Sequence, residues 1–278
     1  MFLNILLMGS SLLMFTVNAG TPPGNHNRIQ VGLCGESPPS DLELTRRIAE
    51  FQKEAGGAKS TRGFFLASRG VATVGYVAAK NSIRIEGRLD ASTPGVLSAL
   101  IATHKHITSL EINSFGGDAR AAYEIANIIR TLQLDLEIGE FCMSACANYL
   151  IPNARTISTN DSVIGFHGSP MACYKKISLI NGLRAWGIQG YLNLRRVAAE
   201  DRQVLAIHPR YKTLIELSQR DDRGAMDNVA REWLIAPPET LSSLGINIKS
   251  VTPGPHFKII SSQPNGLLGK VFVKEVRG

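Results

Sequence analysis

Short apolar runs alternate with longer segments of helical periodicity through the middle of the chain. Four runs have the length and the Ile, Val and Leu content of buried strands, at residues 82–87, 107–114, 134–140 and 161–168. Between strands, residues 93–104 and 119–133 repeat apolar positions at spacings of three and four, which predicts amphipathic helices. Strands that alternate with helices favour an α/β fold in which helices cover a sheet.

The predicted helices differ in how clearly the sequence marks them. Thr93 is a suitable N-cap for the first helix, and Pro94 occupies its first helical position, where proline is favoured. The apolar face of the second helix consists of Ala122, Ile125, Ala126, Ile129 and Leu132. The remaining predicted elements are a charged helix at 41–54, a short helix at 147–152, a mostly helical stretch at 174–220 with glycine interruptions, and a strand, turn and short helix at 233–247.

The two ends of the chain lack this alternation. Residues 1–19 carry no charge, and they end in Val17-Asn18-Ala19, the small-x-small pattern that precedes a signal-peptidase site. The apolar run is shorter than the roughly 20 residues of a membrane-spanning helix. We therefore expect export to the periplasm or the medium with cleavage after Ala19, and a retained membrane anchor is the alternative. The predicted division is a signal peptide at 1–19, a linker with a short helix at 20–79, a catalytic domain at 80–250 and a tail at 251–278.

Composition and charge exclude some classes of function. The net charge is +7, but the basic residues are scattered and do not interleave with aromatic residues, which argues against nucleic-acid binding. The chain has no Cys-x-x-Cys pair and no histidine cluster with the spacing of a zinc site. We therefore expect neither a metal ion nor an organic cofactor.

The predicted export allows the four cysteines to form disulfides. Cys34, Cys142, Cys146 and Cys173 all follow the predicted cleavage site, in a compartment where disulfides are permitted. Four cysteines allow three pairings, and the sequence does not choose among them. Cys142 and Cys146 flank Ser144 symmetrically, so a bond between them would make the serine turn rigid. Cys173 competes as a partner for either, and two unbonded thiols packed under a tight turn are the alternative.

Three predicted strands end in residues that suit acyl transfer. The strand at 107–114 is followed by Gly116-Gly117, the strand at 134–140 leads to Ser144, and the strand at 161–168 ends in His167. The carboxyl ends of parallel strands meet at one edge of a sheet. A serine needs a base, usually histidine, and glycines let backbone N–H groups approach an oxyanion. Each residue alone has an ordinary interpretation as a turn glycine, a helix cap or a core histidine, but their order predicts one site.

Three segments resemble the superfamily of the Clp protease proteolytic subunit and signal-peptide peptidase. "LEINSFGGDARAAYEIANIIR" is similar to its glycine motif and helix, "CMSACANYLIPNARTISTNDSVIGFHG" to its serine turn and histidine strand, and "WLIAPPETLSSLGI" to its closing segment. The Cys-x-Ser-x-Cys arrangement is most similar to an exported Clp-protease-like branch. The resemblance covers roughly residues 80–250. It implies a crotonase-like α/β fold of stacked β-β-α units with helices covering the sheets, and serine peptidase activity.

The resemblance also implies a role for each matched residue. Ser144 is the expected nucleophile and His167 the general base. The expected oxyanion donors are the backbone N–H groups of Gly116 and Ala145, with Gly117 supporting the turn. The implied substrate is a peptide or an unfolded protein, and the implied assembly is a homo-oligomer. Membrane association is expected only through the N-terminal segment.

Two positions depart from the family pattern. Phe115 replaces a proline, and the position of the triad aspartate falls on Arg231, which cannot accept a hydrogen bond from imidazole. Asp227, one helical turn earlier, is our candidate for the third triad member. The other candidates are Asp221, Asp222 and Glu232. If no acid orients the histidine, the alternative function is a weakly active or inactive relative that binds peptides or proteins.

Three further assignments stay open at this point. A Ser–Lys dyad could use Lys175 or Lys176, although a histidine at the matching strand end disfavours it. A cysteine beside Ser144 could be the nucleophile instead. An acyl-CoA enzyme could share the same fold, but the predicted export argues against it.

Overall fold

Nine strands among the described residues form one mixed sheet with helices packed against it. The computed structural model describes residues 71–160, 162–166, 168–217, 233–236, 238–252 and 271–272. The strands are β1 (Thr73–Val77), β2 (Ser82–Glu86), β3 (Ser109–Ser114), β4 (Asp135–Met143), β5 (Ile157–Asn160), β6 (Val163–Phe166), β7 (Trp233–Ile235), β8 (Ile248–Thr252) and β9 (Val271–Phe272). The helices are α3 (Thr93–Thr103), α4 (Ala119–Leu132), η2 (Cys146–Leu150), η3 (Ile151–Asn153), α5 (Pro170–Lys176), α6 (Leu179–Ala206), α7 (Pro209–Leu217) and α8 (Pro238–Ser243).

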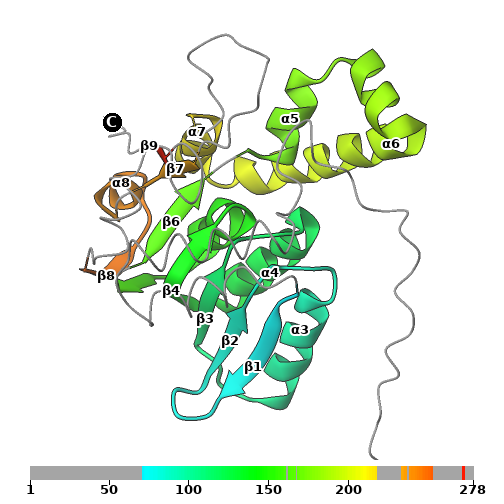
Figure 1. The fold of residues 1–278 in the computed structure, drawn as a ribbon. Helices are drawn as coiled ribbons and strands as arrows, with labels where there is room; N and C mark the ends of the chain where they lie inside the picture. The colour runs from blue at the N-terminus through cyan, green and yellow to red at the C-terminus, as the bar shows by residue number, and fades with distance from the viewer. Residues whose placement is uncertain are drawn as a thin grey trace, which may run out of the picture.

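The sheet runs in the order β1-β2-β3-β4-β6-β7-β9, with β5 beside β4 and β8 beside β5. Only the β1–β2 and β6–β7 ladders are antiparallel, and the other described ladders are parallel. Helices α3 and α4 lie side by side against β1 to β4 (Figure 1). The expected α/β class is confirmed, as a mixed and mostly parallel sheet.

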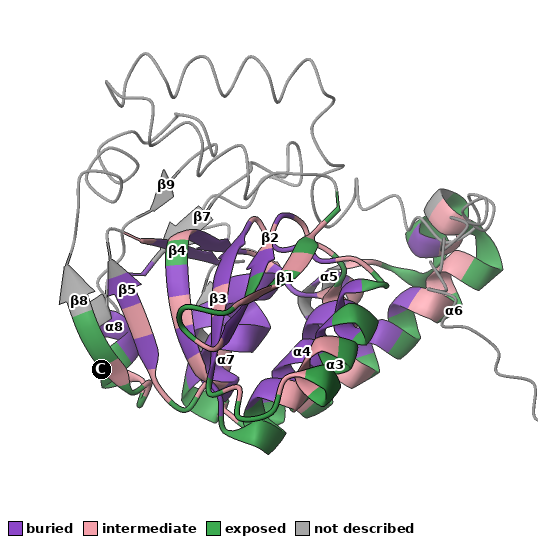
Figure 2. Ribbon diagram, turned by 90° about the horizontal axis from the view of Figure 1, so that it is seen from below, coloured by how far each residue is buried: buried purple, intermediate pink, exposed green. Residues whose placement is uncertain are grey.

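The core lies between α4 and the central strands. Figure 2 shows buried positions along β3, β4 and the inner side of α4. Ile112 of β3 and Ile125 and Ile129 of α4 are at most 1% exposed. All four residues of β6, an inner strand between β4 and β7, are buried, which indicates that both of its faces are covered.

Strand β4 changes its neighbour half way along. Its first half pairs with β5, whereas Phe141, Cys142 and Met143 pair with β6. Its register with β3 also shifts, because Ile112 is opposite Ile138 but Ser114 is opposite Cys142. The side chain of Asn113 compensates for the shift, since its Oδ1 accepts the Phe141 N–H at 2.9 Å. This irregularity carries the end of β4 towards β6.

Helices α5 and α6 extend from the body of the molecule (Figure 1). Helix α6 is kinked at Gly187, whose φ of 66° and ψ of −179° are not helical. The second part of α6 returns to the body and packs against α4 and α7. Among the described helices, none combines the length and the apolar character needed to cross a membrane.

Several sequence predictions need correction. Thr93 is the first residue of α3 and not its N-cap, and its hydroxyl accepts the Asp90 N–H at 3.1 Å. Ser92 occupies the N-cap position, but its side chain makes no capping hydrogen bond. Leu132 is 47% exposed because α4 ends there. The short helix predicted at 147–152 consists of two elements, the π-helical η2 and the 3₁₀-helical η3, and Pro152 lies within η3. The patterns did not predict β1 or β5, and the helix predicted at 41–54 lies outside the described residues.

Candidate active site

Ser144 forms the turn between β4 and the π-helical turn η2. Its φ of 54° lies in the left-handed region, which residues other than glycine seldom adopt. The Ser144 N–H donates to the carbonyl of Gly165 in β6 at 2.9 Å, and its own carbonyl accepts the Asn148 N–H at 2.7 Å. The side chain is partly exposed. A serine on a strained strand-to-helix turn is the arrangement that presents the nucleophile in many hydrolases.

A disulfide closes the Ser144 turn. Cys142, at the end of β4, is bonded to Cys146, the first residue of η2, and their Cα atoms are 5.3 Å apart. Both residues are completely buried. The prediction of a disulfide at these positions is confirmed, and the bond leaves no thiol here for the alternative of a cysteine nucleophile. Cys173 is also disulfide-bonded, and Cys34 lies outside the described residues.

Gly116 packs directly against the Ser144 turn. Its φ is 81°, and a Cβ at this position would lie 2.7 Å from Ala145 N, from Met143 O and from Ser144 Cβ. The glycine loop and the serine turn therefore meet, as the order of the strand ends predicts. No residue larger than glycine fits here without displacing the turn.

The backbone N–H of Gly116 already has a partner. It donates to the buried Ser114 Oγ at 3.0 Å, and Ser114 in turn donates to the carbonyl of Gly87 at 2.5 Å. Gly117, with a φ of 139°, is held by a bridge to Leu89, so it keeps the loop in place. The N–H predicted as one oxyanion donor therefore makes an internal hydrogen bond in this structure.

Ala145 occupies the position next to the serine. It is the N-cap of η2, and an N-cap N–H lies outside the hydrogen bonds of its own helix. The residue is 4% exposed and lies beside Gly116. Its position fits the predicted donation to an oxyanion.

The predicted partners of Ser144 are not among the described residues. His167, Asp227 and Arg231 lie outside them, as do Asp221, Asp222 and Glu232. Within the described part of the chain, no residue forms a hydrogen bond with Ser144 Oγ. Next to position 167, the Gly168 carbonyl accepts a hydrogen bond from Asn148 Nδ2 of η2 at 3.4 Å. The segment that follows β6 therefore contacts the helix that follows Ser144.

A buried polar cluster that was not predicted from the sequence packs against η2. Asp201 of α6 is fully buried and accepts the Met171 N–H at 2.9 Å. Burial raises the pKa of the Asp201 carboxyl, and the Met171 N–H partly opposes this. Near Asp201, the rings of Tyr123 of α4 and Tyr149 of η2 meet edge to face at 4.7 Å between centroids. Burial raises the pKa of both phenols, so the cluster favours neutral groups.

One signal in the sequence could have indicated Asp201. It lies three or four residues from Val197, Ala198 and Leu205, and all three are buried. An acidic residue on the apolar face of a predicted helix indicates a buried carboxyl. Within the described residues, no group of three or more His, Cys, Asp or Glu side chains is placed to hold a metal ion.

Comparisons with known proteins do not assign a function to this chain, so a proposal must rest on the geometry around Ser144. No family model matches the chain, and no curated protein matches it. Among solved structures, the chain is similar to an enoyl-CoA hydratase from Mycobacterium avium subsp. paratuberculosis, with 11% sequence identity and a TM-score of 0.26. That match covers 74% of this chain and 100% of the hydratase. It is a distant structural likeness, and nothing about substrate or chemistry follows from it.

Proposed function

We propose that this protein is an exported serine peptidase of the Clp-protease-like type, with Ser144 as its nucleophile. The observation that carries the proposal is the backbone of Ser144. This residue has a φ of 54° and lies between the two cysteines of a buried disulfide. It packs against Gly116, where the structure leaves no room for a Cβ. Backbone strain that the surroundings maintain is typical of functional positions.

A helix-capping role explains Ser144 poorly. Asp118 and Ser178 show what capping looks like in this protein, since both have extended backbones and accept N–H groups of the first helical turn. Ser144 has a left-handed backbone, and its side chain caps no N–H of η2. Its conformation therefore fits presentation of the hydroxyl better than it fits stabilisation of a helix.

The proposed reaction uses a covalent intermediate. Ser144 Oγ forms a bond to the peptide carbonyl carbon while its proton passes to His167, the predicted base. The carbon–nitrogen bond then breaks, and His167 gives the proton to the leaving amine. A water molecule next attacks the ester and gives a proton to His167, and that proton returns to Ser144 as the acid is released. Asp227 stays our candidate for orienting His167.

The oxyanion must find donors near Ser144. The Ala145 N–H, next to Ser144, is the first candidate donor. The Gly116 N–H can contribute only if its bond to Ser114 Oγ opens when the substrate binds. Opening this bond would be a substrate-induced step, so the activity on small peptides is expected to be low.

The occupied Gly116 N–H also favours a second candidate function. If the Gly116 loop does not change when a peptide binds, the Gly116 N–H stays bonded to Ser114 Oγ. The protein would then bind the peptide carbonyl without stabilising a tetrahedral intermediate. The second candidate is therefore a peptide-binding module without hydrolysis. It predicts the same peptide affinity for the wild type and for Ser144→Ala, with no cleavage by either.

A fluorophosphonate probe separates these candidates. We expect the wild type to be labelled, Ser144→Ala to be unlabelled, and peptide hydrolysis to fall by at least about 10³-fold in the variant. Ser92→Ala, an exposed serine before α3, is the matched control and should be labelled like the wild type. Unlabelled wild type with its disulfide intact and normal circular dichroism would contradict the peptidase proposal.

We further propose that the sheet is of the crotonase-like type. The β1–β2 hairpin followed by α3 is one β-β-α unit. Strand β2 pairs in parallel with β3, the next strand along the chain. An experimental structure of the whole chain that lacks a second unit of this kind would contradict this assignment.

A further inference from the structure

The α5–α6 arm, defined here as residues 170–196, exposes an unusual number of large apolar side chains. Of the eight large apolar residues that are exposed in the described part of the chain, four lie in this arm. They are Leu179 (55% exposed), Ile180 (63%), Ile188 (71%) and Leu192 (47%). Ile188 and Leu192 are four residues apart and share one face of α6. Such a concentration on one projecting element indicates a binding surface.

Every charged residue of the arm is basic. From residue 162 to residue 199 the chain contains no aspartate and no glutamate. The arm contains five basic residues, Lys175, Lys176, Arg184, Arg195 and Arg196. Arg184, Arg195 and Arg196 are all exposed. The arm therefore presents positive charge beside its apolar side chains.

The two acids that follow on α6 act mainly on the body of the molecule, and within the arm Glu200 attracts Arg196, which lies at the base of the arm. Glu200 forms a two-pronged ion pair with Arg120 of α4, at 2.7 and 2.9 Å. Asp201 is buried and accepts the Met171 N–H. Both carboxyl groups are therefore used where α6 joins the body.

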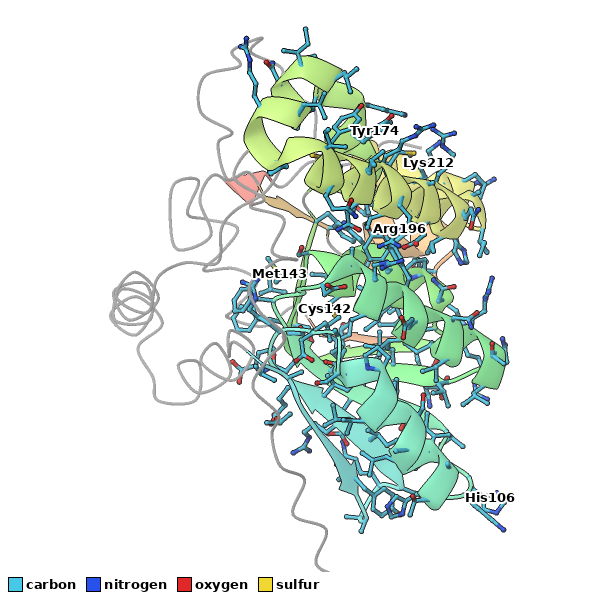
Figure 3. All side chains as sticks on the ribbon, turned by 90° about the vertical axis from the view of Figure 1, so that its right-hand side faces the viewer. His106, Cys142, Met143, Tyr174, Arg196 and Lys212 are labelled. Carbon is cyan, nitrogen blue, oxygen red and sulfur yellow. A yellow bond between two sulfur atoms is a disulfide. The ribbon has the colours of Figure 1, made fainter. Side chains whose placement is uncertain are left out.

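Contacts within the arm hold its shape. The rings of Tyr174 and Tyr191 lie 5.8 Å apart, and Gly182 lies so close to Tyr191 that a Cβ there would be 2.5 Å from the ring. Figure 3 shows Tyr174 out on the arm and Arg196 nearer the body. Because aromatic contacts close the arm on itself, its exposed leucines and isoleucines are not needed to maintain it.

We propose that the arm lies on the surface of a membrane that contains anionic lipids. Exposed aliphatic side chains gain free energy at the boundary between headgroups and acyl chains, and basic side chains gain from anionic headgroups. Aromatic residues such as Trp186, Tyr174 and Tyr191 suit the same interface. This inference goes beyond the proposed peptidase function and does not depend on it.

Two other partners fit the arm less well. Symmetric pairing of the arms of two copies would bring the exposed Arg184, Arg195 and Arg196 of one arm near the same three residues of the other, which is repulsive. A nucleic acid would attract the cations but would leave the leucine and isoleucine side chains without apolar contacts. An anionic lipid surface uses both properties of the arm.

Tryptophan fluorescence tests the arm directly. The chain has two tryptophans, Trp186 in the arm and Trp233 in β7, so full-length Trp233→Phe reports on the arm alone. We expect brominated acyl chains to quench Trp186 in vesicles that mix phosphatidylglycerol with phosphatidylcholine. We expect little quenching in vesicles of phosphatidylcholine alone. Attachment through residues 1–19 alone would leave Trp186 unquenched, so the readout separates the two segments.

Variants in the same background test each property of the arm. Ile188→Ser with Leu192→Ser should weaken partitioning into anionic vesicles by about tenfold, because two aliphatic contacts are lost. Arg184→Gln, Arg195→Gln and Arg196→Gln together should weaken it by at least about tenfold, and added salt should mimic this loss. Val96→Ser, an exposed apolar residue of α3 outside the arm, is the matched control and should leave partitioning unchanged.

Three results would overturn the proposal. The first is protein that sediments with anionic vesicles while Trp186 stays unquenched. The second is equal quenching with neutral and anionic vesicles, unaffected by the arginine variants. The third is a change of oligomeric state by light scattering in the Ile188 and Leu192 variant without any change in partitioning, which would assign the arm to a second copy.

Discussion

Strand β4 is flanked by two residues with nearly the same unusual backbone and very different surroundings. Gln133 precedes the strand with a φ of 53°, and Ser144 follows it with a φ of 54°. Gln133 is the exposed C-cap of α4, and its N–H and side-chain Nε2 both donate to helix carbonyls. A left-handed residue is a common way to end a helix, so its conformation here needs no functional explanation.

Ser144 adopts the same conformation inside a closed structure. The disulfide joins the residues on either side of Ser144, and Gly116 packs against it. The Ser144 N–H donates to the carbonyl of Gly165 in β6. A left-handed backbone therefore indicates a functional position only when several neighbours enforce it. Substitutions at the two ends of β4 should either increase this difference or remove it.

The largest effect is expected from Gly116→Ala. The new Cβ would overlap two backbone atoms and Ser144 Cβ, so we expect the free energy of unfolding to fall by about 3 kcal/mol. Urea denaturation measures the loss, and fluorophosphonate labelling should disappear with it. Gly75→Ala in β1, where nothing lies within 4 Å of the new atom, is the control and should change stability by less than about 0.5 kcal/mol. Equal stability of the two variants would show that Gly116 does not constrain the serine turn.

Removing the disulfide should have the next largest effect. Cys142→Ala with Cys146→Ala opens a short loop, and the entropy of such a loop predicts a loss of about 2 kcal/mol in the free energy of unfolding. The double variant is preferable to a reducing agent because Cys173 is also disulfide-bonded. Labelling of Ser144 should slow as well, measured as the rate of probe incorporation. An unchanged labelling rate would mean that the disulfide stabilises the fold but does not position the serine.

Two aspartates should respond to pH in opposite directions. Burial raises the pKa of Asp201, so its contribution to stability is present at low pH and is lost as pH rises through that pKa. Hydrogen bonds from Arg155 lower the pKa of Asp135, the first residue of β4, so its contribution is present above the unfolded pKa and is lost as pH falls. Melting temperatures between about pH 3 and about pH 8 test both signs.

The asparagine variants make the pH test specific. Asp201→Asn should become more stable than the wild type as pH rises, because it cannot acquire a buried charge. Asp135→Asn should be less stable than the wild type near neutral pH and should converge with it in acid. Parallel pH curves for the two variants would contradict the contrast between the buried cluster and the surface ion pair.

The smallest effect is expected when glycine replaces either left-handed residue. Ser144→Gly and Gln133→Gly should each fall within about 1 kcal/mol of the wild type, on the stabilising side, since relief of strain exceeds the entropic cost of glycine. Thermal melts measure this change. Only Ser144→Gly should abolish labelling. A large loss of stability in Ser144→Gly would mean that the hydroxyl is structural.

The sequence predicted the centre of the fold better than its edges. Helix α4 was predicted within one residue at its C-terminal end, because its apolar spacing is regular and Asp118 caps it. Strands β1 and β5 were missed because "TVGYV" contains a glycine and "ISTN" is mostly polar. The predicted end of β4 was too early, since Asn113 supports three further residues that the apolar pattern alone does not reveal.

The sequence could predict those features of the site that depend on strand topology. It could not predict those that depend on single hydrogen bonds. The meeting of Gly116 with Ser144 followed from parallel strands that end at one edge. The bond from Gly116 N–H to Ser114 Oγ depends on one rotamer, and no pattern of residue types encodes it. The positive φ of Ser144 was equally hidden, because serine carries no preference for that region.

The change of neighbour along β4 has a mechanical consequence. Cys142 and Met143 share a ladder with β6, and the Ser144 N–H donates to Gly165, two residues before position 167. The end of β4 and the end of β6 therefore form one coupled piece, joined to the rest of β4 at the irregularity opposite Asn113. A distortion elsewhere in the sheet should therefore change the spacing between these two strand ends only slightly, because backbone hydrogen bonds join them directly.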